Sequence, residues 1–210
     1  MSLSFDGTII YLITKGEATP ANFDAKSGEI LDIIRLAVEE KVSLVQIREK
    51  ALTARLLIVL ASRAAEITRG SATRLLVNDR ADIAMAAGAD GVHLAADSLA
   101  VDVVRSNFPK KFIIGASTRS FEEAAKASEA DVDFAVFGPV FETPGKGQPK
   151  GLAELSEVCD RLPAFPVLAL GGIDEGNISS VLDAGAAGFA AIRALNDPES
   201  LRSICRQFRK

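Results

Sequence analysis

The chain has 210 residues, of which 48% are hydrophobic and 25% are charged. This composition excludes disordered and fibrous architectures and supplies enough apolar material for one domain with a full core, which we expect to span residues 1–210. The formal net charge is −4, from 24 Lys and Arg against 28 Asp and Glu. Because such a chain has no general attraction to nucleic acid or to an anionic membrane, any polyanion that it binds must meet a local cluster of cations.

The cysteines and the N-terminal segment indicate the cellular compartment. Cys159 and Cys205 lie far apart, in no Cys-x-x-Cys or Cys/His spacing, which argues against a zinc site and against a disulfide scaffold. The opening MSLSFDGTIIYLITKG lacks the basic start and the cleavage site of a signal peptide, and no stretch approaches the ~18 apolar residues of a membrane span. We therefore expect a cytoplasmic protein whose partners include neither a membrane nor a nucleic acid.

Short apolar runs recur along the chain and predict eight strands. They cover residues 9–13, 42–47, 74–78, 90–94, 112–117, 133–138, 166–172 and 187–192. Between them, apolar residues recur every three or four positions, as in Ile30, Ile34 and Ala37, and this spacing predicts amphipathic helices. Apolar strands that alternate with helices are typical of a parallel sheet covered on both faces, the α/β class.

Eight such units favour closure into a compact (β/α)8 TIM barrel over an open sheet. Closed barrels of this kind need about 200–250 residues, so this chain has little room for insertions. The open, doubly wound alternative predicts a glycine-rich first turn that binds a dinucleotide. The segment after the first predicted strand reads TKGEATP and contains no G-x-G-x-x-G motif.

The groups that bind or react in such a barrel lie at the C-terminal ends of the strands and in the loops that follow. This rule selects a set of candidate site residues from their positions alone. The set consists of Gln46, Arg48, Lys50, Asn78, Asp79, Arg80, His93, Asp97, Ser98, Ser117, Thr118, Arg119, Gly171, Gly172, Ile192, Arg193 and the segment 138–151. It is more cationic than the chain as a whole, which indicates an anionic ligand.

The sequence Q-I-R-E-K at 46–50 is the densest part of this set. In a strand, Gln46, Arg48 and Lys50 share one face, so three hydrogen-bond donors converge on the mouth of the barrel. Polar groups that face a barrel axis are costly unless they meet a ligand or a counter-charge, which favours an anion-binding role. The alternative is a structural ion pair between Arg48 and Asp79.

Two glycine-containing segments also indicate an anionic ligand. Gly171-Gly172 lets the backbone approach a phosphate closely, as in the recurrent phosphate site of these barrels; plain turn chemistry is the alternative. The segment 141–151 carries Thr143, Lys146 and Lys150 among glycines and prolines. This composition suits a mobile lid over a bound anion, or a solvated loop whose lysines have no role.

Seven motifs follow one another at the predicted strand ends. They are Y-L-I-T at 11–14, L-V-Q-I-R-E-K at 44–50, L-L-V-N-D-R-A-D at 75–82, G-A-D-G-V-H-L at 88–94, G-A-S-T at 115–118, F-G-P-V-F-E-T at 137–143 and A-L-G-G-I at 169–173. Their order and spacing over nearly the whole chain resemble the thiamine phosphate synthase family and its close relative, the thiazole tautomerase. The synthase resemblance implies a magnesium-dependent transferase that joins a pyrimidine-methyl diphosphate to a thiazole phosphate and expels pyrophosphate.

The resemblance also implies roles for individual residues. It implies a diphosphate clamp of Gln46, Arg48, Lys50, Asn78 and Lys146, Asp79 as a Mg²⁺ ligand, Ser117 near the pyrimidine, and Thr143 and the Gly171-Gly172 backbone around the thiazole phosphate. Such a clamp suits the chemistry, because a departing diphosphate gathers negative charge that Arg48, Lys50 and Lys146 with Mg²⁺ stabilise.

Three positions depart from the family pattern. The second Mg²⁺ ligand of the synthase is replaced by Ser98, and Asp97, one residue earlier, is the candidate ligand in its stead. The histidine usual after the fifth strand is Arg119, a substrate-binding candidate that cannot shuttle a proton. After the eighth strand, Ile192 is followed by Arg193 in place of a serine expected near the thiazole phosphate, and a guanidinium there can bind phosphate more strongly.

Three functions therefore stay open. The first is the synthase; the second is the tautomerase, an isomerase, against which Arg119 counts. The third is a phosphate-binding barrel without turnover, which Arg119, Ala96 and Ser98 favour. The expected partners are small phosphorylated molecules, and the sequence leaves a homodimer open. The single histidine, His93, lies inside a predicted strand, and we expect a buried barrel residue without a catalytic role.

Overall fold

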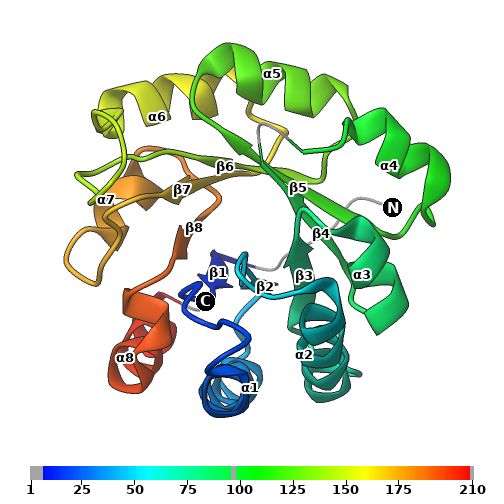
Figure 1. Cartoon of the computed structure of the whole chain (residues 1–210). Coiled ribbons are helices and arrows are strands. Elements are labelled where there is room, and N and C mark those ends of the chain that lie inside the picture. Colours follow the sequence, from blue (N-terminus) through cyan, green and yellow to red (C-terminus); the bar gives the residue numbers. More distant parts are fainter. Residues whose placement is uncertain (1–6, 96–97, 209–210) are drawn as a thin grey trace.

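The computed structural model describes residues 7–95 and 98–208 and shows a closed barrel of eight parallel strands (Figure 1). The strands are β1 (Ile9–Ile13), β2 (Leu44–Ile47), β3 (Arg74–Asn78), β4 (Gly91–Leu94), β5 (Ile113–Thr118), β6 (Phe134–Phe137), β7 (Val167–Leu170) and β8 (Gly188–Ala191). Each strand pairs with its neighbours in sequence, and β8 closes the barrel on β1 with Leu12 opposite Ala191. The predicted TIM barrel and its eight strands are confirmed; that the whole chain forms one domain stays a prediction.

Helices alternate with the strands and lie outside them (Figure 1). They are α1 (Phe23–Glu39), α2 (Ala54–Thr68), α3 (Ala81–Ala87), α4 (Val101–Asn107), α5 (Phe121–Glu129), α6 (Gly151–Arg161), α7 (Ile178–Asp183) and α8 (Pro198–Phe208), with a short 3₁₀ helix, η1 (Ala194–Asn196), before α8. In α1 the predicted apolar stripe of Ile30, Ile34 and Ala37 is buried against the barrel, because residues three and four apart share one helix face. None of the described helices combines the length and apolar character needed to cross a membrane.

Alternation along the strands divides the apolar residues into two layers. Val45 and Ile47 of β2 pack outward against the helices, whereas Leu44 belongs to the interior of the barrel, since successive strand side chains point to opposite faces. Aromatic rings fill much of that interior: the rings of Tyr11 and Phe134 meet edge to face with centroids 5.5 Å apart. Because the interior is packed, a ligand site can form only where the strands end.

Candidate active site

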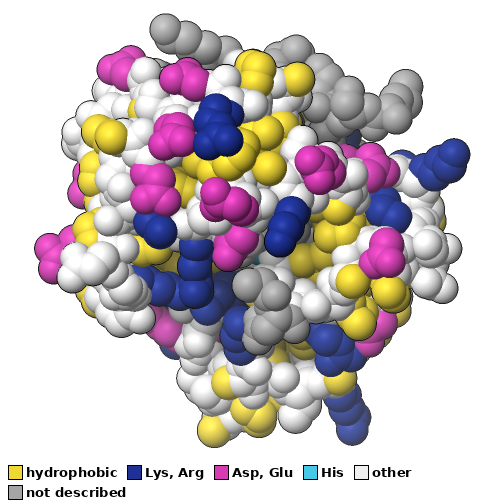
Figure 2. Space-filling model, turned by 90° about the horizontal axis from the view of Figure 1, so that it is seen from above, with side chains coloured by type: hydrophobic (Ala, Val, Ile, Leu, Met, Phe, Trp, Pro, Cys, Tyr) yellow, Lys and Arg dark blue, Asp and Glu magenta, His cyan; other side chains and the backbone are white. Residues whose placement is uncertain are grey.

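The loops that follow the strands all lie at one end of the barrel, because the eight strands are parallel. We call this end the mouth. Figure 2 shows Lys and Arg side chains gathered around a hollow in the middle of the face that it draws. The concentration of cations expected from the sequence therefore has a counterpart on the molecular surface.

A chain of hydrogen bonds joins β2 to β3 at the mouth. The Gln46 side chain is 1% exposed, and its Nε2 donates to Oδ1 of Asn78 at 3.0 Å. Asn78 in turn donates from Nδ2 to Oδ2 of Asp79 at 2.6 Å, and Nζ of Lys50 lies 3.8 Å from the same oxygen. Four of the predicted site residues are thus connected, and the acceptor Oε1 of Gln46 is buried with no partner in the described chain.

Asp79 is the most constrained residue of this cluster. Its backbone has a φ of +59°, and its amide donates to the carbonyl of His93 at 2.9 Å. Oδ1 accepts the Ala95 amide at 3.1 Å and the Ser98 hydroxyl. Burial by itself raises the pKa of Asp79, but the bonds from Ser98, Ala95 and Asn78 and the charge of Lys50 outweigh it, so the pKa lies below its ordinary value. Asp79 is therefore an anion at neutral pH.

The expectation that Arg48 and Lys50 continue the face of the second strand is wrong, because β2 ends at Ile47. Beyond the end of the strand Glu49 is buried: it is 3% exposed, and its carboxylate accepts hydrogen bonds from the amides of Gly16 at 3.0 Å and Ala18 at 2.8 Å. The amide of Arg48 donates to Oγ1 of Thr14 at 2.8 Å. These bonds attach the loop after β2 to the loop after β1.

The Arg48 guanidinium lies beside the loop after β1 and acts on the interior of the mouth. A Cβ placed on Gly16 would lie 3.4 Å from its Nη1, and the charge of Arg48 contributes to lowering the pKa of His93. The guanidinium has no hydrogen bond or ion pair within the described residues. The alternative ion pair with Asp79 is also wrong, since the cation beside Asp79 is Lys50.

Ser117 on β5 lies next to His93 on the neighbouring strand β4. Its hydroxyl lies 2.9 Å from Nε2 of His93, whose ring is 4% exposed. Burial lowers the pKa of His93 to about 4, with the charges of Asp79 and Arg48 acting in opposite directions. The expectation that His93 is buried in the barrel is confirmed, and the ring is uncharged at neutral pH.

The loop between β6 and α6 folds back over Gly171 and Gly172. Both glycines have positive φ values, +100° and +64°, and an added Cβ would lie 2.5 Å from Pro139 at Gly171 and 2.7 Å from Phe141 at Gly172. Both close packing and turn geometry therefore require glycine here. The same packing brings Oγ1 of Thr143 to 3.1 Å from the Cβ position at Gly171, so two predicted phosphate-binding elements lie side by side.

The remaining predicted cations are exposed at strand ends. Arg119 follows β5, Lys146 lies in the loop after β6, and Ile192 and Arg193 follow β8, next to the strand that ends at Gly171-Gly172. None of the three cationic side chains has an ion pair or hydrogen bond to another described residue. Asp97, the second predicted metal ligand, lies outside the described residues.

Metal ligands are sparse in the part of the chain that the structure describes. No group of three or more His, Cys, Asp or Glu side chains there could hold a metal ion. Asp79 is the one carboxylate within the connected cluster. Its Oδ1 accepts two donors, whereas Oδ2 accepts one, from Asn78, and lies 3.8 Å from Nζ of Lys50. Mg²⁺ commonly takes one or two carboxylates and completes its shell with phosphate oxygens and water. The donor set fits a Mg²⁺ that arrives with a diphosphate.

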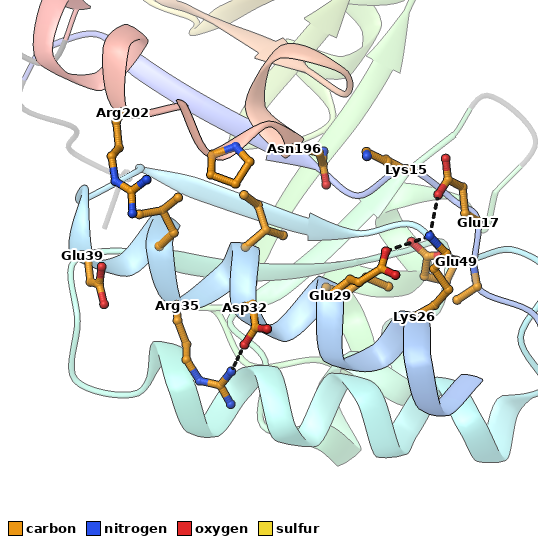
Figure 3. Close-up of a pocket in the computed structure, with 15 residues that line it drawn as sticks. Lys15, Glu17, Lys26, Glu29, Asp32, Arg35, Glu39, Glu49, Asn196 and Arg202 are labelled. Carbon is orange, nitrogen blue, oxygen red and sulfur yellow. Dashed lines mark hydrogen bonds and ion pairs between the residues drawn. The ribbon is translucent and has the colours of Figure 1, made fainter. Parts of the chain in front are cut away.

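A separate groove of about 520 Å³ opens outside the barrel between α1 and α8 (Figure 3). Its charges are largely paired: Lys26 points between Glu17 and Glu29 and bonds to both, at 3.2 and 2.7 Å. None of the predicted site residues lines this groove. Its wall includes residues of three segments that follow strands: Glu17 after β1, Glu49 after β2 and Asn196 after β8.

Sequence reasoning missed Glu49 and the partnership of His93 with Ser117. Glu49 stands between two cations and reads as a solvated charge, and nothing local shows that Gly16 and Ala18 need its carboxylate. His93 reads as core, and its partner lies 24 residues later in the chain. Both roles depend on contacts between different strand ends.

Comparisons with known proteins agree on one family. The family profile described as thiamine monophosphate synthase matches residues 10–195. The chain is 36% identical over 204 residues to a thiamine-phosphate synthase of Roseiflexus castenholzii, covering 94% of this chain and 86% of the relative. It is 38% identical over 181 residues to one of Methanoculleus marisnigri, covering 85% of each.

A solved structure, thiamine phosphate pyrophosphorylase from Pyrococcus furiosus, is similar with a TM-score of 0.79 and 30% identity. The match covers 95% of this chain and 96% of that one. The resemblance drawn from the strand-end motifs is confirmed.

Proposed function

The chain belongs to the thiamine monophosphate synthase family, and we propose that it joins hydroxymethylpyrimidine diphosphate to thiazole phosphate with release of pyrophosphate. One observation carries the proposal: a cluster of four bonded side chains at the mouth, Gln46, Asn78, Asp79 and Lys50. The guanidinium of Arg48, which has no partner among the described residues, adds a second cation. This arrangement offers an anion several donors and two cations at positions already held by the fold. The tautomerase alternative gains no support, because Arg119 stands where its histidine would be.

The reaction needs stabilisation of a leaving group more than it needs a base. The bond between the pyrimidine methylene carbon and the diphosphate oxygen breaks, the oxygen keeps the electron pair, and the thiazole nitrogen forms the new bond to carbon. Negative charge therefore grows on the diphosphate, where Arg48, Lys50 and Lys146 act as the catalytic cations. Gln46 and Asn78 orient the same group through their amides.

The remaining predicted residues serve the two rings and the second phosphate. Ser117 lies beside the pyrimidine, and Arg119 is available to either substrate at the rim. The thiazole phosphate is held by Thr143, the backbone of Gly171 and Gly172, and the loop of Ile192 and Arg193. This assignment is supported by the adjacency of β7 and β8 and by the contact between Thr143 and Gly171, since the loops after the last two strands form the usual phosphate site of such barrels.

Mg²⁺ would be held by Oδ2 of Asp79 together with oxygens of the diphosphate and water. When bound, it neutralises charge on the leaving group. Asp97 stays a candidate second ligand. Ser98 donates to Asp79 and so helps to keep this carboxylate ionised and oriented. A homodimer and a cytoplasmic location stay predictions.

The test is release of pyrophosphate from the two substrates with Mg²⁺. We expect release by the native sequence and its loss in Asp79→Ala. The matched control is Asp82→Ala, because Asp82 is an exposed carboxylate of α3 that pairs with Arg80 and has no bond to the cluster. Tight binding of thiazole phosphate without release would favour the binding protein without turnover. Isomerisation of a thiazole carboxylate phosphate without release would favour the tautomerase.

A further inference from the structure

Within the described residues the His93 imidazole makes one polar side-chain contact, and that contact is directed toward the mouth. The ring lies inside the barrel, and its centroid is 5.8 Å from the centroid of the Tyr11 ring and 6.1 Å from that of the Phe134 ring. Nε2 lies 2.9 Å from Oγ of Ser117, which is two residues nearer the mouth than Gly115, the residue opposite His93 on β5. Nδ1 is buried and has no hydrogen-bond partner among the described residues.

An uncharged imidazole carries one N–H and one lone pair. An imidazolium would carry two N–H groups, and Nδ1 has no acceptor among the described residues, so the buried ring is uncharged. Either Nε2–H donates to Ser117 and Nδ1 carries the lone pair, or the Ser117 hydroxyl donates to Nε2 and Nδ1 carries the hydrogen. The surroundings of Nδ1 decide between these two forms.

Nδ1 faces the backbone of Gly115. A Cβ placed on Gly115 would lie 2.8 Å from Nδ1, so an α-hydrogen of this glycine points toward that nitrogen. A lone pair at Nδ1 receives this C–H as a weak donor, whereas an N–H at Nδ1 would face another hydrogen and lack an acceptor. Because buried N–H groups without an acceptor are rare and costly, the hydrogen belongs on Nε2.

We propose that His93 is a positioning residue that donates Nε2–H to Ser117 and thereby directs the Ser117 hydroxyl hydrogen toward an acceptor atom of the substrate. Ser117 is half-buried at the mouth, and its hydroxyl has no other partner in the described chain. The group that docks against it must therefore present a lone pair, as an unprotonated ring nitrogen of a heteroaromatic substrate does. The identity of that ring as a pyrimidine rests on the proposed function.

The tautomer can be measured directly because the chain has a single histidine. With ¹⁵N-labelled histidine, a long-range ¹H–¹⁵N correlation spectrum at pH 7 should show a protonated, pyrrole-type Nε2 and an unprotonated, pyridine-type Nδ1. A protonated Nδ1, alone or in an imidazolium, would overturn the proposal. This readout uses the unmodified protein and no substrate, so its outcome is independent of whether the proposed reaction occurs.

Paired substitutions test the effect on the reaction. His93→Leu removes the donor, whereas the amide of His93→Gln can still donate to Ser117. We expect kcat/KM for the pyrimidine substrate to fall about tenfold in His93→Leu, the value of one hydrogen bond, and to be largely retained in His93→Gln. In a Ser117→Ala background, His93→Leu should have no further effect. Equal losses in both His93 variants, or an undiminished loss in the Ser117→Ala background, would contradict a role through Ser117.

Discussion

The two sides of the mouth differ in how their polar groups are held. At the ends of β2 and β3, the side chains of Gln46, Asn78 and Asp79 are bonded to one another, and Glu49 fixes the backbone beside Arg48. We call this the fixed side. After β5, β6 and β8, which we call the free side, the cations Arg119, Lys146 and Arg193 are exposed and have no partner within the described residues.

This difference shows which polar groups of the site the fold holds in position before a substrate binds. Groups held in place before the substrate arrives stabilise developing charge without a cost of reorganisation at that moment. Exposed lysines and arginines lose conformational freedom when they bind, so they add less to the net affinity. We therefore expect substitutions on the fixed side to have the larger effects on turnover and folding, and those on the free side to have smaller effects and to leave folding unchanged.

Arg48→Ala should have the largest effect. It removes the cation that the backbone bonds of the fixed side support, and we expect pyrophosphate release to slow on the order of 10²–10³-fold. The control is Arg63→Ala, which removes an exposed guanidinium from α2. If steady-state kinetics show similar rates for Arg48→Ala and Arg63→Ala, the expectation of a larger effect on the fixed side is wrong.

The second-largest effect that we expect is a loss of folding stability at acidic pH, because His93 is buried and uncharged beside the fixed side. Its folded pKa of about 4 lies below the ordinary 6.5, so the unfolded chain binds the proton first as the pH falls. The contribution of neutral His93 to the free energy of unfolding is complete above about pH 6.5. It is lost as the pH falls to 4, and the total loss is about 3 kcal/mol.

Urea unfolding between pH 7 and pH 4 measures this loss. His93→Leu cannot titrate at this position, so the acid-induced loss of stability should be smaller in that variant. Identical pH profiles of the unfolding free energy in the two proteins would contradict the assignment to His93.

Glu49→Ala should lower the free energy of unfolding by about 2 kcal/mol, because the buried amides of Gly16 and Ala18 lose their acceptor. Removing a negative charge near Arg48 would by itself strengthen pyrophosphate binding. We expect weaker binding instead, since the loop that supports Arg48 is released. Urea unfolding measures the change in stability, and calorimetric titration with pyrophosphate measures the change in affinity. The control is Glu39→Ala, a substitution of an exposed glutamate.

Lys146→Ala should have the smallest effect, and it should weaken ligand binding without changing folding stability. This lysine is exposed on the loop after β6, so we expect about tenfold weaker pyrophosphate binding, roughly 1.4 kcal/mol, with an unchanged melting temperature. Lys111→Ala, another exposed lysine, is the control. A lower melting temperature in Lys146→Ala alone would show that the loop contributes to the barrel itself.

The strands and the list of residues at their ends could be read from the sequence because both depend on local pattern. Apolar runs such as Ile9–Ile13 and the helical spacing of Ile30 and Ile34 repeat within a few residues, and eight repeats in 210 residues leave a closed barrel as the economical arrangement. The position of a residue just after a strand then assigns it to the mouth, as for Asn78 and Asp79.

What only the tertiary structure decided is how those residues meet. Glu49 is buried because its carboxylate accepts the amides of Gly16 and Ala18 in a different loop. Lys50 rather than Arg48 becomes the neighbour of Asp79, and Nε2 of His93 reaches Ser117 on the next strand. Contacts of this kind depend on the register and closure of the barrel, which bring together segments distant along the chain, so no local pattern encodes them.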